Sequence, residues 1–317
     1  MLLVGCQAST KAIGEVTKTA DLSKIVGIYY LANDVSTDET KNFTNLSAKL
    51  KTKISSSHPN WKVNIYDITT KLPFEIDDLL KLNKDFAVTL GENTLLKILA
   101  SRSKVPIFSL NTPRVTLDRM RKIYADLNIQ LSGIYREQPF PNQLALAKAI
   151  RPDYENIYVL LGRLSRFHLN DYKNDVALLE YNLKYRILEN QDSTAAYFSG
   201  MLPELGFLTL LDNSQQFELG NIELLLPVSF QLDIPMIGNR LIHGNIGALA
   251  SIYSGQNELV EETNQIIEQY FTHNKYQDPK YLKNFSVFVN QQIAQSFNYP
   301  NLDEKQLKLI INKNFSQ

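Results

Sequence analysis

Polar residues that would suit a small-solute site follow the predicted β-strands of this chain. They are mostly Asn, Ser, Thr, Gly and Arg, which form neutral hydrogen bonds or charge-assisted bonds to a carboxylate. Gly91 and the amides after it would place an anion at a helix amino terminus. The same residue types are ordinary turn and cap residues, so a binding cleft and generic loops are both open interpretations. The segments are Ala32-Asn33, Gly91-Glu92-Asn93-Thr94, Asn111-Thr112-Pro113, Tyr135-Arg136, Gly162-Arg163-Leu164-Ser165, Asp212-Asn213-Ser214 and Gly238-Asn239-Arg240.

Motifs for catalysis are missing from the sequence. It has no GxSxG nucleophile elbow, no GxGxxG after the first predicted strand and no GK[ST] phosphate loop. Glu75, Asp77 and Asp78 form an acidic helix start, which the helix dipole explains better than acid–base chemistry does. We therefore expect a protein that is not an enzyme and that needs no cofactor.

Metal-binding patterns are also missing. The one cysteine, Cys6, rules out a disulfide framework and a Cys-rich zinc or iron–sulfur site. The four histidines form no HxxxH or HxH pair, and we expect surface or hydrogen-bonded roles for them rather than metal ligation. They are His58, His168, His243 and His273.

The amino terminus resembles a bacterial lipobox. In the string Leu3-Val4-Gly5-Cys6, small residues would admit the signal peptidase, and the Cys6 thiol would then carry the lipid anchor. A full signal would also have a basic region and a longer apolar stretch, so we expect a start that is truncated or misassigned. A polar tether follows, and Gln7 in place of Asp fits outer-membrane sorting. The alternative is an accidental LVGC string in a cytosolic chain.

Length and charge narrow the class of protein further. The chain has 317 residues, which suggests about two domains, with 33 basic and 33 acidic side chains. Nucleic acid is an unsuitable partner for such a balance, because phosphate binding needs an excess of Lys and Arg. No apolar run approaches the roughly 18–20 residues that a membrane-spanning helix needs.

Short apolar runs alternate with amphipathic segments from Lys24 onward. The first half predicts strands and intervening helices in the order βαβαβαβ, which is typical of a parallel sheet covered on both faces. The pattern then starts again, so the fold class is α/β with two Rossmann-like lobes. The first set of strands is Ile25–Leu31, Trp61–Ile68, Asp85–Leu90 and Val105–Leu110. The second set of elements is Ile129–Ile134, Asn142–Ile150, Asn156–Leu161, Asp171–Leu183, Tyr185–Leu188, Phe207–Leu211, Ile234–Ile237, Gly255–Phe271, Phe285–Val289 and Asp303–Asn312.

Several strings, taken in order, resemble the ABC-transporter substrate-binding family that includes tryptophan- and other aromatic-amino-acid-binding lipoproteins. That family has a type I periplasmic-binding fold. The similarity covers roughly residues 85–298, and the order of the pieces carries it because each piece alone is weak. The strings are FAVTLGEN from Phe86, VPIFSLNTP from Val105, IQLSGIY from Ile129, QLALAKAIRP from Gln143, IPMIGN from Ile234, GALASIY from Gly247 and FVNQQIAQSF from Phe288.

The sequence departs from the family pattern near the expected cleft. Thr112 replaces an aspartate before a proline, Glu92 replaces a small residue after Gly91, and Asn298 replaces a late glycine. Lys41 to Leu50 also lacks the Gly-Phe and the "dGL" ending that the family's first helix commonly carries. The sequence therefore predicts the fold better than it predicts the ligand. A relative that kept the scaffold and changed or lost its ligand would show such a pattern.

The resemblance implies two lobes joined by three hinge crossings, near 111–116, 239–245 and 284–290. Residues 1–23 would be a signal remnant and tether, lobe one would contain 24–112 and 246–284, and lobe two 113–240 and 290–317. A ligand between the lobes would shift an open–closed equilibrium. We expect Arg163 or Arg136 to pair with a carboxylate, and Tyr135 or Tyr30 to stack on a flat ligand, although most of the 16 tyrosines should cap the core edge. The ligand-binding candidates are Asn93, Thr94, Asn111, Thr112, Tyr135, Arg163, Asp212 and Asn239.

Two functions follow as hypotheses. The first is a monomeric, lipid-anchored solute-binding protein of the bacterial envelope, on the periplasmic side, which captures a small solute such as an amino acid for an ABC permease. The second is a structural or regulatory envelope lipoprotein with a changed or vestigial cleft, which partners a sensor or an envelope complex. Outer-membrane sorting by Gln7 favours the second, because an importer works at the inner membrane. In both hypotheses the lipid on Cys6 is the only contact with the membrane.

Overall fold

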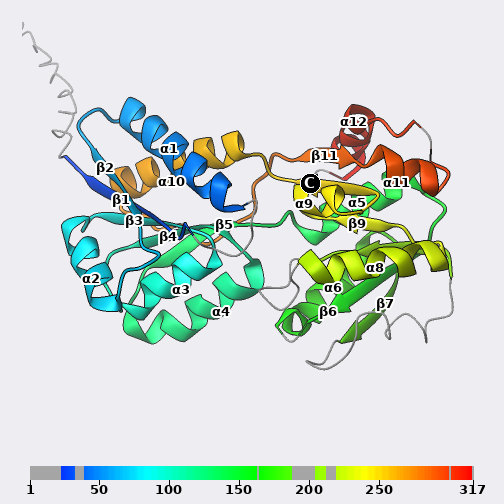
Figure 1. Cartoon of the computed structure of the whole chain (residues 1–317), viewed down its shortest axis with the longest axis horizontal. Coiled ribbons are helices and arrows are strands. Elements are labelled where there is room, and N and C mark those ends of the chain that lie inside the picture. Colours follow the sequence, from blue (N-terminus) through cyan, green and yellow to red (C-terminus); the bar gives the residue numbers. More distant parts are fainter. Residues whose placement is uncertain are drawn as a thin grey trace, which may run out of the picture.

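The structure is a computed structural model that describes residues 23–32, 39–162, 164–187, 204–211, 219–299 and 301–315. These residues form two lobes that lie side by side along the long axis of the molecule (Figure 1). Each lobe is built on one β-sheet with helices on both faces. The predicted α/β class with two Rossmann-like lobes is therefore confirmed.

Lobe one contains a five-stranded parallel sheet in the order β2-β1-β3-β4-β5. Its strands are β1 (Ile25–Tyr30), β2 (Lys62–Asp67), β3 (Phe86–Leu90), β4 (Ile107–Thr112) and β5 (Leu131–Tyr135). All five residues of β3 are buried, as expected for a central strand with both faces covered. Successive residues serve different cores: Val88 packs on one face of the sheet and Ala87 on the other.

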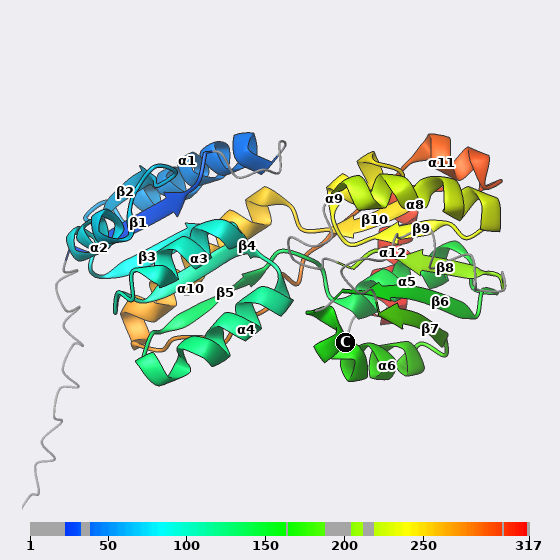
Figure 2. The same ribbon diagram turned by 60° about the horizontal axis from the view of Figure 1, so that its bottom comes forward.

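The helices of lobe one divide between the two faces of this sheet (Figure 2). One face packs against α1 (Glu39–Ser57) and α10 (Gln256–His273), which contribute Leu50 and Ile267 to its core. The other face packs against α2, α3 and α4. These helices are α2 (Pro73–Leu82), α3 (Glu92–Ala100) and α4 (Arg114–Tyr124), followed by a 3₁₀ turn, η1 (Ala125–Leu127).

Lobe two contains a six-stranded sheet in the order β11-β10-β9-β8-β6-β7. All neighbours are parallel except β10 and β11, which pair in antiparallel fashion. The strands are β6 (Asn156–Leu161), β7 (Asn182–Ile187), β8 (Gly206–Thr209), β9 (Met236–Gly238), β10 (Ala250–Tyr253) and β11 (Ser286–Val289). The antiparallel β11 closes one edge of the sheet.

Helices also cover both faces of the second sheet. The larger core contains residues of α5 (Phe140–Ile150), α6 (Leu169–Leu178) and α12 (Glu304–Phe315), and the smaller core lies under α8 (Leu219–Leu232). Short helical segments complete the lobe: η2 (Ser165–His168), α9 (Leu241–Asn245) and α11 (Gln291–Ser296).

Sheet membership corrects the expected lobe boundaries at two places. The sequence analysis assigns 113–135 to lobe two, but β5 pairs with β4 in lobe one. It also assigns 246–253 to lobe one, but β10 pairs with β9 in lobe two. Strands and helices alternate in the same way in both lobes, so the apolar pattern does not mark the strand after which the chain changes sheet.

The chain passes between the lobes in three short segments, 136–139, 254–255 and 283–284, which we call the crossing segments. The nearest core residues on the two sides of each segment are Ile134 and Phe140, Ile252 and Val260, and Leu282 and Phe285. The hinges expected near 111–116 and 239–245 are therefore wrong, because each lies before a strand that still belongs to the preceding sheet. The hinge expected near 284–290 overlaps the third segment.

Local elements differ from those expected from the sequence most clearly at three points. The helix predicted at Asp171–Leu183 ends at Leu178, because Glu180 takes a left-handed backbone (φ 58°) and β7 begins two residues later. Helix α4 and strand β10 were not expected. Both are weak signals, since β10 has only four residues and α4 is predominantly polar.

Two features are missing from the described part of the chain. None of its helices combines the length and the apolar character needed to cross a membrane. None of its His, Cys, Asp and Glu side chains gather in threes that would hold a metal ion.

Candidate functional site

The carboxyl ends of the parallel strands in both sheets face the boundary between the lobes. The chain leaves the carboxyl end of β5 directly into the first crossing segment, and that of β10 into the second. Strands β1–β4 run parallel to β5, and β6–β9 run parallel to β10, so their carboxyl ends meet the same boundary. In open α/β sheets this edge is where ligands bind, and we take it as the candidate site.

The start of α3 contributes a buried polar cluster from lobe one. Gly91 adopts a positive φ of 91° and leads into the helix at Glu92. The Glu92 side chain is buried, and its Oε1 accepts a hydrogen bond of 2.6 Å from the Thr116 hydroxyl of α4. Thr94 is fully buried and its Oγ1 has no hydrogen-bond partner in the structure, whereas Asn93 is half-buried. The sequence candidates Asn93 and Thr94 therefore directly follow a residue with a buried carboxylate.

The end of β4 carries two further candidates, Asn111 and Thr112. Asn111 has a left-handed backbone (φ 59°), and the pairing with β5 shifts register between Leu110 and Thr112. The Thr112 side chain is fully buried, and its hydroxyl lies 2.7 Å from that of Ser109. The hydroxyl of Thr112 is thus already engaged inside lobe one, while Asn111 is half-buried at the irregular position.

Tyr135, at the end of β5, is held by α4 rather than exposed for stacking. Its hydroxyl donates a hydrogen bond of 2.7 Å to Asp118, and its ring centroid lies 4.7 Å from that of Tyr281. Burial, with the carboxylate of Asp118 as a second cause, raises the pKa of Tyr135. The phenol therefore stays protonated at neutral pH and serves as a donor to Asp118.

A second carboxylate, that of Glu137, occupies the start of α4. The backbone N–H of Arg114, the first residue of α4, donates to the two carboxylate oxygens at 3.0 and 3.3 Å. Glu137 is buried, as is Glu92 at the start of α3. A helix amino terminus attracts anions because its N–H groups are unpaired and the dipole is positive there. On the lobe-one side, then, the chain places its own carboxylates at both helix starts, where the sequence analysis expected a ligand anion after Gly91.

Lobe two contributes Asn239 at the end of β9, beside a buried histidine. Asn239 is buried, its N–H donates to Nδ1 of His243 at 3.3 Å, and its Oδ1 has no partner in the structure. Burial, and then the charges of Arg240 and Arg136, hold the pKa of His243 well below its usual value of 6.5. The imidazole is therefore neutral and accepts through Nδ1.

Two guanidinium groups from opposite sides of the boundary act on this imidazole. Arg136 follows β5 of lobe one, and Arg240 follows β9 of lobe two. Burial lowers the pKa of Arg240 to about 10, which still leaves it charged at neutral pH. The boundary therefore brings positive charge near His243 and negative charge at the starts of α3 and α4.

The remaining candidates lie outside the described residues. Arg163, Asp212 and the proposed lipid-anchor residue Cys6 are among them. The roles of Glu92, Glu137 and His243 were not predicted from the sequence. The contacts of Glu92 and Glu137 join residues 24 and 23 positions apart, and His243 contacts Asn239, four residues earlier, where no motif marks the pair. Only Glu92 left a signal, as a departure from the family pattern beside Gly91.

Comparison with known sequences gives no identification: no protein-family model matches the chain, and no curated protein matches it. Comparison with solved structures does find similar folds. The ligand-free, open structure of CD0873, a substrate-binding protein with adhesive properties from Clostridium difficile, matches with a TM-score of 0.65 at 11% identity, over 89% of this chain and 97% of that one.

Two more solved structures match over nearly their whole length. An ABC domain in complex with L-Trp from Streptococcus pneumonia has a TM-score of 0.60 at 14% identity, over 90% of this chain and 98% of that one. A periplasmic ribose ABC transporter from Conexibacter woesei has a TM-score of 0.52 at 12% identity, over 90% and 97%. Together with the two sheets and their order, these matches show that this chain has the two-lobe fold of type I periplasmic substrate-binding proteins.

Proposed function

We propose that this chain is a solute-binding protein that captures a small solute between its two lobes by hinge closure. The observation that carries the proposal is the convergence of both parallel sheets, through their carboxyl ends, on one boundary crossed by three short segments. A solute that contacts both lobes stabilises the closed arrangement by its extra affinity for that state.

The charges at the boundary favour a zwitterionic solute such as an amino acid over a simple anion. The starts of α3 and α4 already hold Glu92 and Glu137, so an added carboxylate there would meet a like charge. The positive groups Arg136 and Arg240 lie near His243 and would take the carboxylate instead. An ammonium group would then face the acidic side, and the match to a structure holding L-Trp makes that amino acid a sensible first probe.

We further propose that the protein works at the bacterial envelope on the periplasmic side, as a monomer anchored through a lipid on Cys6, and delivers its solute to an ABC permease. The support is the Leu3-Val4-Gly5-Cys6 string and the names of the matched structures. Palmitate incorporation into the protein expressed in a bacterial host tests the anchor: labelling should be lost in Cys6→Ala. Labelling that persists in that variant would remove Cys6 from the proposal.

A second candidate function is a structural or regulatory envelope protein whose cleft has changed. The specific observation in its favour is that several groups at the boundary are already paired within the protein. Glu137 accepts a hydrogen bond from the backbone N–H at the start of α4. The Thr112 hydroxyl shares a hydrogen bond with that of Ser109, and the Tyr135 hydroxyl donates to Asp118. A cleft that has satisfied its own polar groups has fewer of them to offer a solute.

Thermal unfolding of residues 8–317 against amino acids, nucleosides and sugars separates the two candidates. A ligand at about one hundred times its dissociation constant should stabilise the native state by about 2.7 kcal/mol. In a protein of this size that is a shift of a few degrees in melting temperature. We expect a shift with an amino acid and none with ribose. A flat response at millimolar concentrations would reject the amino-acid proposal and favour the second candidate.

A pair of variants then locates the bound solute. Glu92→Gln keeps the size of the side chain and its acceptor for Thr116 but removes the charge that would face an ammonium group. We expect it to weaken the amino-acid response about tenfold. Glu268→Gln, on the exposed side of α10, is the matched control and should leave the response unchanged. An equal response in wild type and Glu92→Gln would place the solute elsewhere.

A further inference from the structure

One buried side chain, Gln138, connects all three crossing segments. It lies in the first segment, and its Nε2 donates to the Ser254 hydroxyl of the second at 2.5 Å. The same Nε2 donates to the carbonyl oxygen of Leu282, at the edge of the third, at 3.4 Å. The side chain is only 1% exposed, which limits competition from water for these bonds.

The hydrogen-bonding capacity of this amide suits three partners at once. A glutamine amide has two N–H donors and an oxygen acceptor. Both donors are accounted for by Ser254 and Leu282, and Oε1 accepts from Nδ2 of Asn142, in the first turn of α5, at 3.0 Å. The side chain thereby joins α5 of lobe two to the two other crossing segments.

Neighbouring contacts restrain the first crossing segment from the other side. Glu137 binds the start of α4 in lobe one, and the Arg114 guanidinium reaches across the boundary to Asp171 of α6, with an N–O distance of 2.8 Å. Side chains of Arg114 and Asp171 are 29% and 48% exposed, so water screens that pair. The Gln138 side chain, in contrast, is buried and lies within a crossing segment.

Rotation of one lobe against the other must change the spacing of the crossing segments, because they are the covalent links between the lobes. A change in spacing stretches the bond to Ser254 or to Leu282, and a buried polar group that loses its partner is costly. The amide therefore resists rotation away from the arrangement in which all three bonds are made.

We propose that Gln138 is a positioning residue that clasps the three crossing segments and sets the angle between the two lobes. It acts on the open–closed equilibrium of the empty protein, so the inference depends on the two-lobe fold and not on the identity of the solute. Loss of the clasp should widen the range of interlobe angles sampled in solution.

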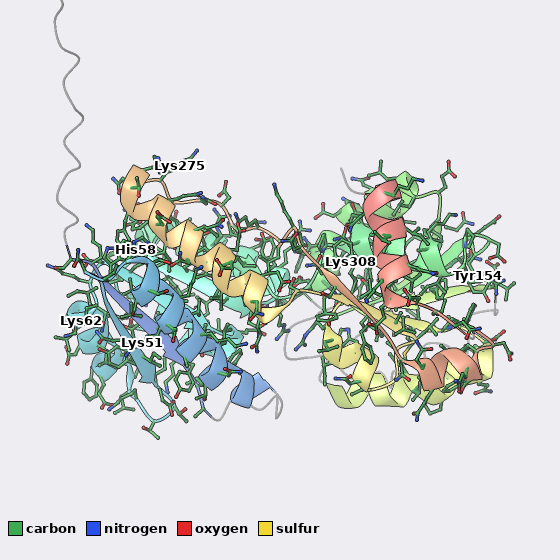
Figure 3. All side chains as sticks on the ribbon, turned by 90° about the horizontal axis from the view of Figure 1, so that it is seen from above. Lys51, His58, Lys62, Tyr154, Lys275 and Lys308 are labelled. Atoms are coloured by element: carbon green, nitrogen blue, oxygen red, sulfur yellow. The ribbon has the colours of Figure 1, made fainter. Side chains whose placement is uncertain are left out.

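The test measures distances between the lobes by double electron–electron resonance in the ligand-free chain. Cys6 is first replaced by Ser, because it is the only native cysteine. Spin labels are attached at Lys51→Cys on α1 and Lys305→Cys on α12, both exposed positions. Figure 3 shows these helices on opposite lobes, with Lys51 and Lys308 labelled on them. The distance distribution then reports the angle between the lobes.

The decisive variants are Gln138→Ala and Gln138→Glu. The second keeps the size and shape of the side chain but replaces the amide donors with a carboxylate, which accepts hydrogen bonds and is repelled by the carbonyl oxygen of Leu282. We expect both to broaden the distance distribution or move its maximum relative to the wild-type protein.

Gln143 provides a matched control one turn further along. It is also a buried glutamine whose Nε2 bridges two acceptors, the carbonyl oxygens of Leu210 and Ile237 at 3.0 and 2.7 Å, but both of these lie in lobe two. Gln143→Ala should lower stability while it leaves the interlobe distribution as in wild type.

Two results would overturn the proposal. One is a wild-type distribution in folded Gln138→Glu, and the other is the same broadening in Gln143→Ala as in the Gln138 variants. Should neither Gln138 variant fold, Ser254→Ala removes one bond of the clasp alone. It should then give a smaller change in the same direction, and an unchanged distribution in Ser254→Ala would also count against the clasp.

Discussion

His243 is a buried imidazole held neutral by its surroundings. Its Nδ1 accepts a hydrogen bond from the backbone N–H of Asn239, and the positive charges of Arg240 and Arg136 act on the ring. Because these groups disfavour the charged form, the pKa of His243 in the folded state lies well below 6.5, whereas the unfolded chain would titrate near 6.5. Below pH 6.5 the unfolded state binds more protons than the folded state. The contribution of neutral His243 to the free energy of unfolding is therefore fully present above pH 6.5. It is lost as the pH falls toward the folded-state pKa.

His243→Asn should reduce this acid sensitivity. Asparagine keeps an acceptor for Asn239 but cannot be protonated, so the free energy of unfolding should fall less steeply between pH 6.5 and 5. The expected difference in slope is at most about 1.4 kcal/mol per pH unit, the value for one proton. Urea unfolding at several pH values measures it, with His273→Asn, at the exposed end of α10, as control. Equal slopes for wild type and His243→Asn would contradict the assignment.

The site residues divide according to what a sequence can reveal. Thr94, Asn111 and Asn239 were named from their place after predicted strands. The structure puts Thr94 in the first turn of α3, Asn111 near the end of β4 and Asn239 directly after β9. The carboxylate partners were not foreseeable, because Glu92 meets Thr116, and Glu137 meets Arg114, only once β3, β4 and β5 have paired. The place of a residue after a strand can be predicted from the local sequence. The partner of a buried charge cannot, because the fold brings it from elsewhere in the chain.

Helix α4 depends on a group outside itself for its start. Its preceding residue is Pro113, which offers no side-chain cap, and the first N–H is satisfied by Glu137 from the first crossing segment. A carboxylate here both fills an unpaired donor and complements the helix dipole. The same contact fastens the crossing segment to lobe one, so helix stability and lobe placement share one interaction.

Glu137→Ala should lower the free energy of unfolding by about 1–2 kcal/mol, the cost of losing a helix cap at a buried site. Glu137→Gln keeps an acceptor but loses the charge, and its cost should be smaller, about 0.5–1 kcal/mol. Urea unfolding measures both. Glu268→Ala, at an exposed position of α10, should stay within about 0.5 kcal/mol of wild type. A Glu137→Ala variant as stable as that control would show that the start of α4 does not need the carboxylate.

The sequence predicted elements better where they are long and apolar. The buried strands β1, β3 and β6 lie close to their predicted positions because uninterrupted apolar runs are unusual outside sheets. Strand β10 was not predicted because its four residues, Ala250–Tyr253, carry too short a pattern. Helix α4 was not predicted because its polar residues outnumber its apolar ones. Such elements form because they pair or pack with residues far away in the sequence, and a local stretch of sequence does not reveal those partners.

At the scale of the whole molecule, the residues that the structure describes form four cores in two lobes, which the crossing segments join. Two cores lie on either side of the lobe-one sheet, and two on either side of the lobe-two sheet. The sequence analysis predicted two lobes but assigned β5 and β10 to the wrong ones, because a parallel strand looks alike in either sheet. Separate cores raise the question of whether the lobes unfold together.

The single tryptophan allows the unfolding of lobe one to be followed by itself. Trp61 packs in lobe one, where its ring lies 3.8 Å from that of His58 and 4.8 Å from that of Phe271, centroid to centroid. Its fluorescence therefore reports the lobe-one core, whereas far-ultraviolet circular dichroism reports the helices of both lobes. Different midpoints for the two signals would show that the lobes are separate cooperative units.

Two matched core variants make this test decisive. Phe207 lies fully buried in a lobe-two core and Phe108 in a lobe-one core, and replacement of a buried Phe by Ala typically costs about 3–5 kcal/mol. We expect Phe207→Ala to lower the circular-dichroism midpoint in urea while the Trp61 transition moves much less, because its cavity lies in the other lobe. Phe108→Ala should move the Trp61 transition most. If both signals shifted together in both variants, the crossing segments would couple the lobes into one unit, and the free energy that couples them would have to exceed the cost of either cavity.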